Sequence, residues 1–233
     1  MIYCFGDSWA AGAELTKGQH PFVHWAAAAL DTDYINFGKN RNSLGIIVHN
    51  IVQQLNQITA EDLVIVVVPP DTRWYDENPG QGFYSLSLQS RPLDQRADFL
   101  KFLNYKTLEW FKYHHALFIY VIQKMLNDCG CTYIMMHNYG QIADIKKYAL
   151  QVDYNKFLSE HDLTTLLTQQ HYTWPNYSEL QSLAQNVGST DGPPSDIFTG
   201  KYFEGCEYHP NELGHREIAR LLVQKYQQQK AQS

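Results

Sequence analysis

The sequence predicts a doubly wound α/β fold, in which helices cover both faces of a mostly parallel β-sheet. Short apolar runs alternate with longer amphipathic stretches along much of the 233-residue chain. A parallel strand buried on both faces is typically a continuous apolar run, and parallel neighbours need a crossover between them. Hydrophobic residues make up 44% of the sequence, and a chain of this length can fill one sizeable core.

The expected elements follow one another in order along the chain. The runs expected to form buried strands are Ile2 to Phe5, Tyr34 to Phe37, Leu63 to Val68 and Thr132 to Met136. The expected helices run from Phe22 to Leu30, from Leu44 to Ile58, from about Gln95 to Asn127 and from about Asn211 to Gln228. The last helix is indicated by apolar residues that recur on one face. Strands separated by helices predict right-handed crossovers.

Two stretches depart from this alternation. Residues 69–94 begin with two prolines and mix aromatic residues with Gly and Ser, and residues 139–205 contain the turn-forming run VGSTDGPPSD. Long irregular segments within a compact domain are often functional loops. The sequence shows neither repeats nor a linker, so we expect residues 1–233 to form a single domain with loop insertions.

Composition and charge exclude several classes of protein. The net charge of −6 provides no basic field for nucleic acid, so we expect no nucleic-acid partner. No apolar run reaches the roughly 20 residues that span a bilayer, so we expect no membrane association. The first expected strand starts at residue 2, which leaves no room for an export signal. A cytoplasmic location, or release without an export signal of its own, is therefore expected, and an oligomer or a larger assembly remains open.

The four cysteines do not suggest a metal site or a disulfide framework. They are Cys4, Cys129, Cys131 and Cys206. Structural zinc sites need two separated pairs, or cysteines with well-spaced histidines, and neither pattern is present. Reduced and mostly buried thiols are the favoured interpretation.

The first informative motif is FGDSWAAG, residues 5–12, at the end of the first expected strand. The apolar run stops at Gly6, and Ser8 stands just beyond the carboxyl end of the strand. Open α/β sheets bind their ligands at this edge, which favours a functional serine. A structural role is the alternative, because Asp and Ser side chains also cap a following helix. The local sequence leaves both interpretations open.

The second motif is EGCEYHPNELGHREIA, residues 204–219, at the start of the last helix. Proline fits the first turn of a helix, so Pro210 keeps the preceding His209 extended and ahead of that helix. Such a histidine can project its ring from a rigid loop into a cleft. His215 lies about one and a half turns into the helix and should point elsewhere.

Together these motifs resemble the GDSL, or SGNH, hydrolase superfamily of serine esterases and acetylesterases. The matching residues are Gly6, Asp7, Ser8 and Gly12 in the N-terminal block, and His209, Pro210, Asn211, Gly214 and His215 in the C-terminal block. The resemblance implies a flavodoxin-like three-layer fold. It also implies ester hydrolysis through an acyl-enzyme on Ser8, with His209 as the base. It implies no metal and no organic cofactor.

The same resemblance implies donors for the oxyanion of the tetrahedral intermediate. In the second block, INFGKNRNS, Arg41 stands where the family has a glycine amide, and Gly38 is a nearby alternative. In the third block, Asp71 stands where an asparagine is expected. Arg73 could offset the charge of Asp71 and bind an anionic substrate, or it could pair with Asp71 in a structural role only. We expect Arg41 and Arg73 to make the mouth of the cleft positive.

The acid that orients His209 is open in the sequence. The family has an aspartate three residues before its histidine, and that position holds Cys206 here. Glu207 is the first choice for the orienting acid, Glu204 is the second, and a dyad supported by a backbone carbonyl is the third.

The function predicted from the sequence is therefore a serine esterase. The resemblance implies an ester substrate, for example a short acyl ester such as an acetyl ester, and only the aromatic residues of the stretch 69–94 point to a carbohydrate as its alcohol. The alternative is a binding or assembly module that keeps the fold but has weak or lost catalysis. Its support is the replacement of three family residues by Arg41, Asp71 and Cys206.

Overall fold

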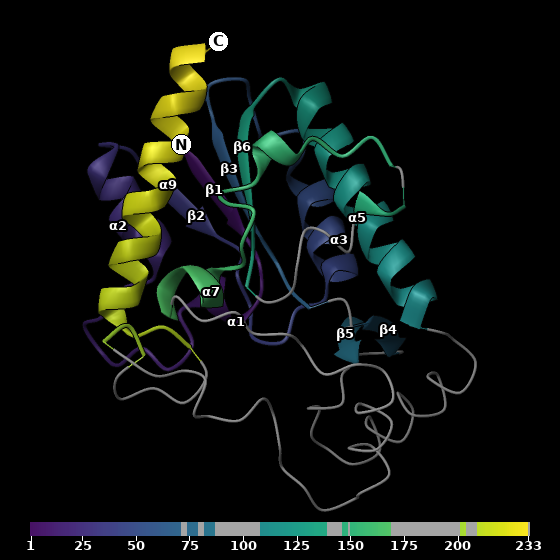
Figure 1. Ribbon diagram of the computed structural model, residues 1–233, viewed down its shortest axis with the longest axis horizontal. Coiled ribbons are helices and arrows are strands. Elements are labelled where there is room, and N and C mark those ends of the chain that lie inside the picture. The colour runs from purple at the N-terminus through teal and green to yellow at the C-terminus, as the bar shows by residue number, and fades with distance from the viewer. Residues whose placement is uncertain are drawn as a thin grey trace, which may run out of the picture.

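A four-stranded, all-parallel sheet forms the centre of the protein (Figure 1). The structure is a computed structural model that describes residues 1–70, 74–78, 82–86, 108–138, 146–148, 150–168, 201–203 and 209–232. The strands are β1 (Ile2–Phe5), β2 (Tyr34–Asn36), β3 (Leu63–Val68) and β6 (Thr132–His137). They lie in the order β2-β1-β3-β6. The chain steps from β1 to one side and then returns to its other side, so the strand order reverses between β1 and β3.

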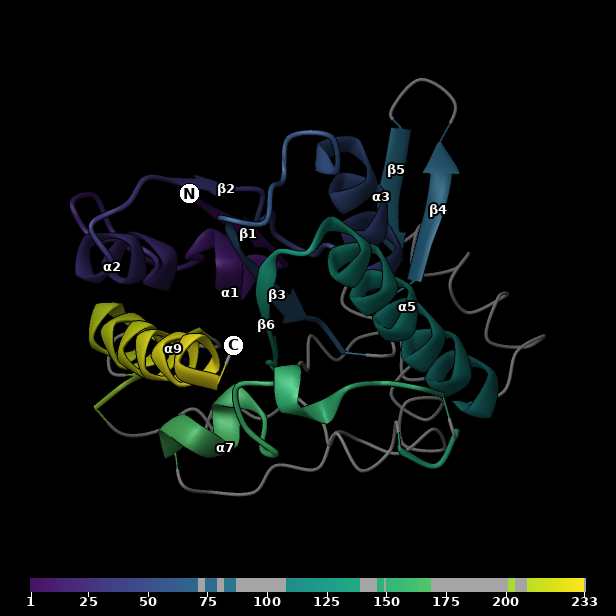
Figure 2. The ribbon, with the colours of Figure 1, turned by 90° about the horizontal axis from the view of Figure 1, so that it is seen from above.

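Helices cover both faces of the sheet, as Figure 2 shows from above. The helices are α1 (Ser8–Ala11), α2 (Phe22–Ala29), α3 (Leu44–Gln54), α5 (Leu108–Cys129), α7 (Leu163–Thr168) and α9 (Glu212–Gln232), with a short 3-10 turn at Tyr154–Lys156. On one side α2 packs against α9, with α7 beside them. On the other side α3 packs against α5.

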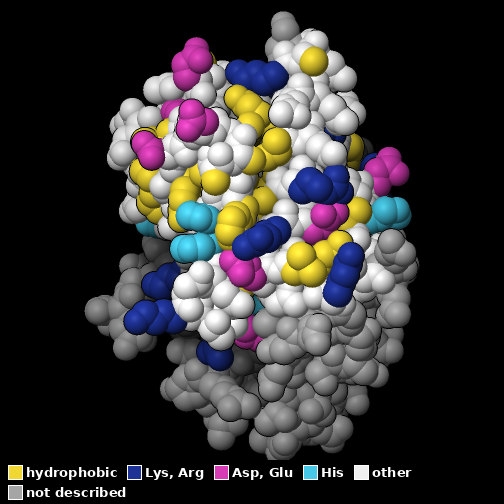
Figure 3. Space-filling view, turned by 90° about the vertical axis from the view of Figure 1, so that its left-hand side faces the viewer, with side chains coloured by type: hydrophobic (Ala, Val, Ile, Leu, Met, Phe, Trp, Pro, Cys, Tyr) yellow, Lys and Arg dark blue, Asp and Glu magenta, His cyan; other side chains and the backbone are white. Residues whose placement is uncertain are grey.

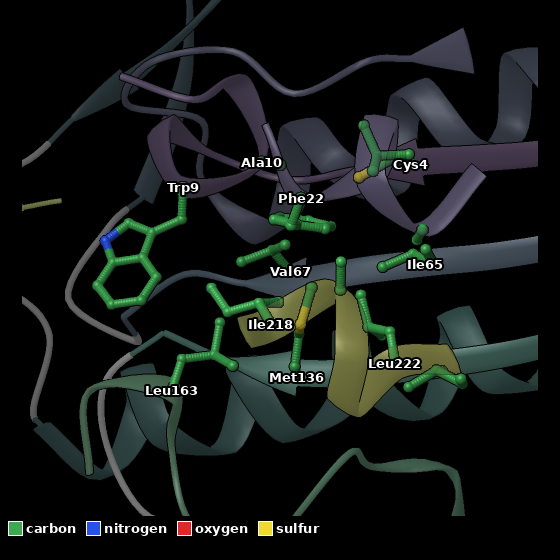
Figure 4. Close-up of a cluster of buried hydrophobic side chains, with 14 of the residues drawn as sticks. Cys4, Trp9, Ala10, Phe22, Ile65, Val67, Met136, Leu163, Ile218 and Leu222 are labelled. Carbon is green, nitrogen blue, oxygen red and sulfur yellow. The ribbon is translucent and has the colours of Figure 1, made fainter. Parts of the chain in front are cut away.

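The side chains of β1, β3 and β6 alternate between two hydrophobic cores. Toward α2 and α9, Cys4 and Met136 meet helix residues such as Phe22 (Figure 4). Toward α3 and α5, the neighbouring Phe5 and Met135 join the second core. Every residue of β1 and β3 is buried, which explains why both strands are continuous apolar runs in the sequence.

The predicted α/β architecture is confirmed, with small shifts at element ends. The strands β1 and β3 have the predicted bounds, β2 is one residue shorter and β6 is one residue longer. Helix α3 ends at Gln54 rather than Ile58, because the Leu55 N–H turns back to the Val52 carbonyl at 3.4 Å. The predicted helix start near Gln95 lies outside the described residues, and the single-domain organisation stays a prediction.

The stretch 69–94 contains regular structure that the sequence did not predict. It holds a second, antiparallel pair of strands, β4 (Trp74–Asn78) and β5 (Gly82–Leu86). Trp74 pairs with Leu86 and Asn78 with Gly82. The interpretation as an irregular loop was wrong for these ten positions, because neither strand is a continuous apolar run and the sequence between them contains Pro and Gly.

The described thiols fit the expected pattern. Cys4 and Cys131 are buried and Cys129 is half-buried, and none of the three forms a disulfide. Burial raises the pKa of the Cys131 thiol to about 12 and raises that of Cys4 further, so both stay protonated at neutral pH. Cys206 lies outside the described residues.

Candidate active site

Ser8 stands at the carboxyl edge of the sheet, at the point where the strand order reverses. It is the first residue of α1, and only Gly6 and Asp7 separate it from the end of β1. Gly6 allows the sharp turn between them, since an added Cβ would lie 2.6 Å from the Ala10 Cβ and 2.7 Å from the Val67 Cβ. Asp7 caps the short helix through its side chain, which accepts the Trp9 N–H at 3.1 Å. The predicted cap is therefore real, and it belongs to Asp7.

The loop after β2 wraps closely around this turn. The Asn36 amide donates to the Ala10 carbonyl at 2.7 Å, and the Asn42 amide donates to the Gly6 carbonyl at 3.0 Å. Gly38 lies so close that a Cβ there would be 2.6 Å from the Ala10 carbonyl carbon. Main-chain groups on both sides of Ser8 are thus held by a neighbouring loop.

His209 reaches Ser8 from the far end of the chain. Its Nε2 lies 2.8 Å from the Ser8 Oγ, across 201 residues of sequence. The histidine precedes α9, whose first turn is capped by Asn211 through a 3.0 Å bond from the Gly214 N–H. The Asn211 amide also donates to the Lys201 carbonyl at 2.8 Å. The helix start is therefore fixed directly beside the histidine.

The other ring nitrogen of His209 contacts a carboxylate that the sequence did not single out. Its Nδ1 lies 2.8 Å from the Glu14 Oε1. A carboxylate only accepts, so this contact places a proton on Nδ1 and leaves Nε2 of a neutral ring free to accept from Ser8. The line Ser8–His209–Glu14 has the connectivity of a nucleophile, a base and an orienting acid.

Glu14 reaches this place through a tight reversal after α1. Gly12 ends the helix in the left-handed conformation at φ 74°, and Glu14 itself has φ 68°. A non-glycine residue in that region is disfavoured by roughly 1–2 kcal/mol. Such strain is characteristic of functional sites, where the surroundings hold a residue in place.

The structure thus brings together two of the predicted site residues, Ser8 and His209. Of the predicted donors near them, the Gly38 amide is already engaged by the Asn36 Oδ1 at 2.8 Å. Arg41 is exposed and has φ 66°, the left-handed conformation that a glycine adopts freely. The remaining predicted positions lie outside the described residues: Asp71, Arg73, Glu204, Cys206 and Glu207.

Glu14, Asn42 and Asn138 lie at the site but were not predicted from the sequence. Asn138 follows β6, and its amide donates to the Asp7 Oδ2 at 2.7 Å. Glu14 is the first carboxylate after the serine motif, but the family pattern directs attention to acids beside the histidine. Asn42 and Asn138 carry weaker signals: each is a polar residue that follows a strand on the edge where Ser8 lies.

His215, as predicted, does not share the position of His209. It is fully buried, and its Nδ1 accepts the Phe22 N–H at 3.1 Å, which satisfies the first turn of α2. Burial lowers the pKa of His215 to about 3, with a smaller contribution from nearby His209, so the ring is neutral. His215 therefore joins α9 to α2.

The described residues contain no group of three or more His, Cys, Asp or Glu side chains suited to a metal ion. Charges on the face formed by α2 and α9 are mixed in sign (Figure 3). Two ion pairs lie within α9: Arg220 with Glu217 at 2.6 Å and Arg216 with Glu212 at 3.6 Å. Within the described part of the chain, no helix has the length and apolarity needed to cross a membrane.

Comparisons with known proteins give similar solved structures only. No protein-family model matches the sequence, and no curated protein matches it. A lipolytic protein of the G-D-S-L family from Veillonella parvula is 14% identical, with a TM-score of 0.46, covering 97% of this chain and 96% of that one. Axe2, an acetylxylan esterase from Geobacillus stearothermophilus, is 11% identical, with a TM-score of 0.47, covering 96% and 92%.

Proposed function

We propose that the protein is a serine esterase in which Ser8 is the nucleophile, His209 the base and Glu14 the orienting acid. The observation that carries this proposal is the continuous hydrogen-bonded line from Ser8 through His209 to Glu14, with both contacts at 2.8 Å. The matching motifs at the two ends of the chain support it independently, because they are properties of the sequence alone.

The proposed reaction has two halves. Ser8 Oγ attacks the ester carbonyl carbon while His209 Nε2 takes the hydroxyl proton and then passes it to the departing alcohol. Water next attacks the acyl-enzyme, giving its proton to His209, and the carboxylic acid leaves as Ser8 regains a proton. Glu14 holds the Nδ1 proton in place and stabilises the imidazolium formed in each half.

The oxyanion of the tetrahedral intermediate needs donors, each contributing about 3–4 kcal/mol. The main-chain amides of Ser8 and Arg41 are the proposed donors. Gly38 is less suitable because its N–H already bonds to Asn36. The left-handed φ of Arg41 supports its role, since the family pattern has a glycine there. Asp71 and Arg73 remain proposed neighbours of the oxyanion.

A short acyl ester is the proposed substrate class, and an acetyl ester on a carbohydrate is the first substrate to try. The residues that favour sugar belong to the stretch 69–94, whose side chains lie outside the described part. The binding-module alternative loses one of its three supports, because Glu14 supplies a carboxylate at His209 despite the cysteine at position 206.

Labelling with a fluorophosphonate probe followed by peptide mapping tests the proposal. The wild-type protein should be modified at Ser8 and should hydrolyse p-nitrophenyl acetate, and Ser8→Ala should lose both properties with little change in melting temperature. His209→Asn should be unlabelled as well. A correctly folded protein that neither reacts with the probe nor hydrolyses simple acyl esters would instead be a binding module.

A further inference from the structure

The carboxylate of Asp7, next to the proposed nucleophile, has a second partner far away in the sequence. The residue is fully buried. Its Oδ1 makes the local cap to the Trp9 N–H, and its Oδ2 accepts from the Asn138 Nδ2 at 2.7 Å across 131 residues. The first contact shapes the turn, and the second ties that turn to the end of β6, with β3 between them in the sheet.

Asn138 is itself held on three sides. Its N–H donates to the Val68 carbonyl at 3.3 Å, at the end of β3. Its carbonyl accepts from the Thr164 hydroxyl at 2.9 Å and from the Thr164 N–H at 3.4 Å, so it is also tied to α7. The residue is fully buried, like Asp7. A side-chain amide fixed in this way presents its N–H groups in one direction.

We propose that Asn138 is a positioning residue, which acts through Asp7 to aim the Ser8 hydroxyl at His209. This role rests on the proposed esterase function. The helix that begins at Ser8 has only four residues, so it has little stability of its own and depends on its cap. A short hydrogen bond to a buried carboxylate is among the stronger ones in proteins. Without the hydrogen bond from Asn138, the Asp7 carboxylate can rotate, and the turn that carries Ser8 then changes its position.

Loss of the Asn138 side chain should affect the chemical step rather than substrate binding. A reacting group displaced by about 1 Å can lose about 100-fold in rate. Asn138 donates to the Asp7 carboxylate, so its loss should lower kcat and leave KM nearly unchanged. A purely structural role would instead lower the melting temperature and leave kcat of the folded enzyme as it was.

The sharpest test is to exchange the side chains of Asp7 and Asn138. Asn138→Leu removes the donor at similar volume, and Asn138→Asp sets a second carboxylate against Asp7. Both should lower kcat, and the rate of fluorophosphonate labelling at Ser8, by about 30–100-fold or more. The double variant Asp7→Asn with Asn138→Asp restores a donor–acceptor pair, because the new amide at position 7 can donate to position 138 and still cap Trp9. It should recover at least about tenfold over Asn138→Asp alone.

Two further variants separate positioning from stability. Gln123→Leu is the matched control, since Gln123 is buried on α5 and bonds both main-chain groups of Asp153, at 2.7 and 3.0 Å. It should lower the melting temperature and leave kcat unchanged. Thr164→Val removes one hydroxyl that holds Asn138 while keeping the shape of the side chain. It should reduce kcat about three- to tenfold even if Asn138→Leu does not fold.

The outcomes distinguish this inference from the proposed function. If the wild-type protein is labelled at Ser8 but Asn138→Leu, or Thr164→Val in its place, keeps wild-type kcat, Asn138 does not position Ser8. Failure of the exchange variant to exceed Asn138→Asp overturns the inference too. If the wild-type protein is not labelled at all, the esterase proposal fails first, and the inference fails with it.

Discussion

The two halves of the candidate site are built very differently. The segment that carries Ser8, residues 6–14, is held by three asparagine side chains: Asn36 at the end of β2, Asn42 in the loop that follows, and Asn138 just after β6. The histidine side consists of His209 at the start of α9, fixed mainly by the helix cap of Asn211. Ser8 is 6% exposed, whereas the side chains of His209 and Glu14 are 16% and 28% exposed.

This contrast fits the chemistry assigned to each half. A nucleophile must be aimed, because its attack depends on position and angle, whereas a base must exchange protons with a leaving group and with water. We infer that changes in the buried segment alter rate through geometry. Changes at the more exposed ring and its carboxylate alter rate through proton transfer.

The largest effect on kcat is expected at the more exposed half of the site, where Glu14 contacts His209. Glu14→Gln removes the carboxylate from Nδ1 and should lower kcat by about 10³–10⁴-fold, because the ring is then free to take the wrong tautomer. Steady-state kinetics with p-nitrophenyl acetate measures this. Glu207→Gln is the control and should be nearly silent. The reverse pattern would give the orienting role to Glu207, as the sequence first suggested.

The next largest effect is expected in the buried turn that carries Ser8. Gly6→Ala puts a methyl group 2.6 Å from the Ala10 Cβ, so the turn must shift. The free energy of unfolding should fall by about 1–3 kcal/mol, and kcat should fall as well because Ser8 moves with the turn. Gly18→Ala also loses stability, since Gly18 has φ 93°, but it faces open space and should keep full activity. Equal kcat values for the two variants would contradict a geometrically tight turn.

A smaller effect is expected on the pH dependence of stability, through three buried histidines. Burial lowers the pKa of His215 and His115 to about 3 and that of His137 to about 4. Below about pH 6.5, the histidine pKa in the unfolded chain, these three side chains bind protons in the unfolded state but stay neutral in the folded state. Stability should therefore fall as the pH drops from about 6.5 toward 4, and it should be fully regained above about 7.

Chemical denaturation at pH 5 and pH 7.5 measures this loss. Each histidine should contribute about 2 kcal/mol to the difference. His215→Asn keeps an acceptor for the Phe22 N–H but does not titrate, so it should show a smaller difference than the wild-type protein. An unchanged difference would mean that His215 does not titrate as its burial requires.

The smallest effect is at the mouth of the site. Arg41→Gly relieves the left-handed strain but adds chain entropy to the unfolded state, so stability should rise by only about 0.5–1 kcal/mol. The main-chain amide remains, so hydrolysis of neutral esters should be nearly unchanged. A preference for esters that bear a carboxylate should decrease, most clearly at low salt. Arg41→Lys keeps the charge and is the control; an equal loss in both variants would argue against a charge effect.

The sequence by itself determined the α/β class and the bounds of β1 and β3. It also predicted Ser8 and His209 as candidate site residues, and the fold brings these two together. These rest on local signals, since a strand buried on both faces is a continuous apolar run and each motif is contiguous. The position of Ser8 also follows from local information, because a residue just after β1 must lie at the carboxyl edge of the sheet.

Only the tertiary structure decided which groups surround those two residues. Glu14 meets His209 across 195 residues, and Asn138 meets Asp7 across 131. Neither pairing leaves a periodic or contiguous trace in the sequence. The Glu14 contact depends on a left-handed backbone at a residue whose type does not favour it, and the Asn138 contact depends on the strand order β2-β1-β3-β6. Local propensity carries no information about which strand ends meet, so only the folded arrangement shows which carboxylate contacts His209 and which amide contacts Asp7.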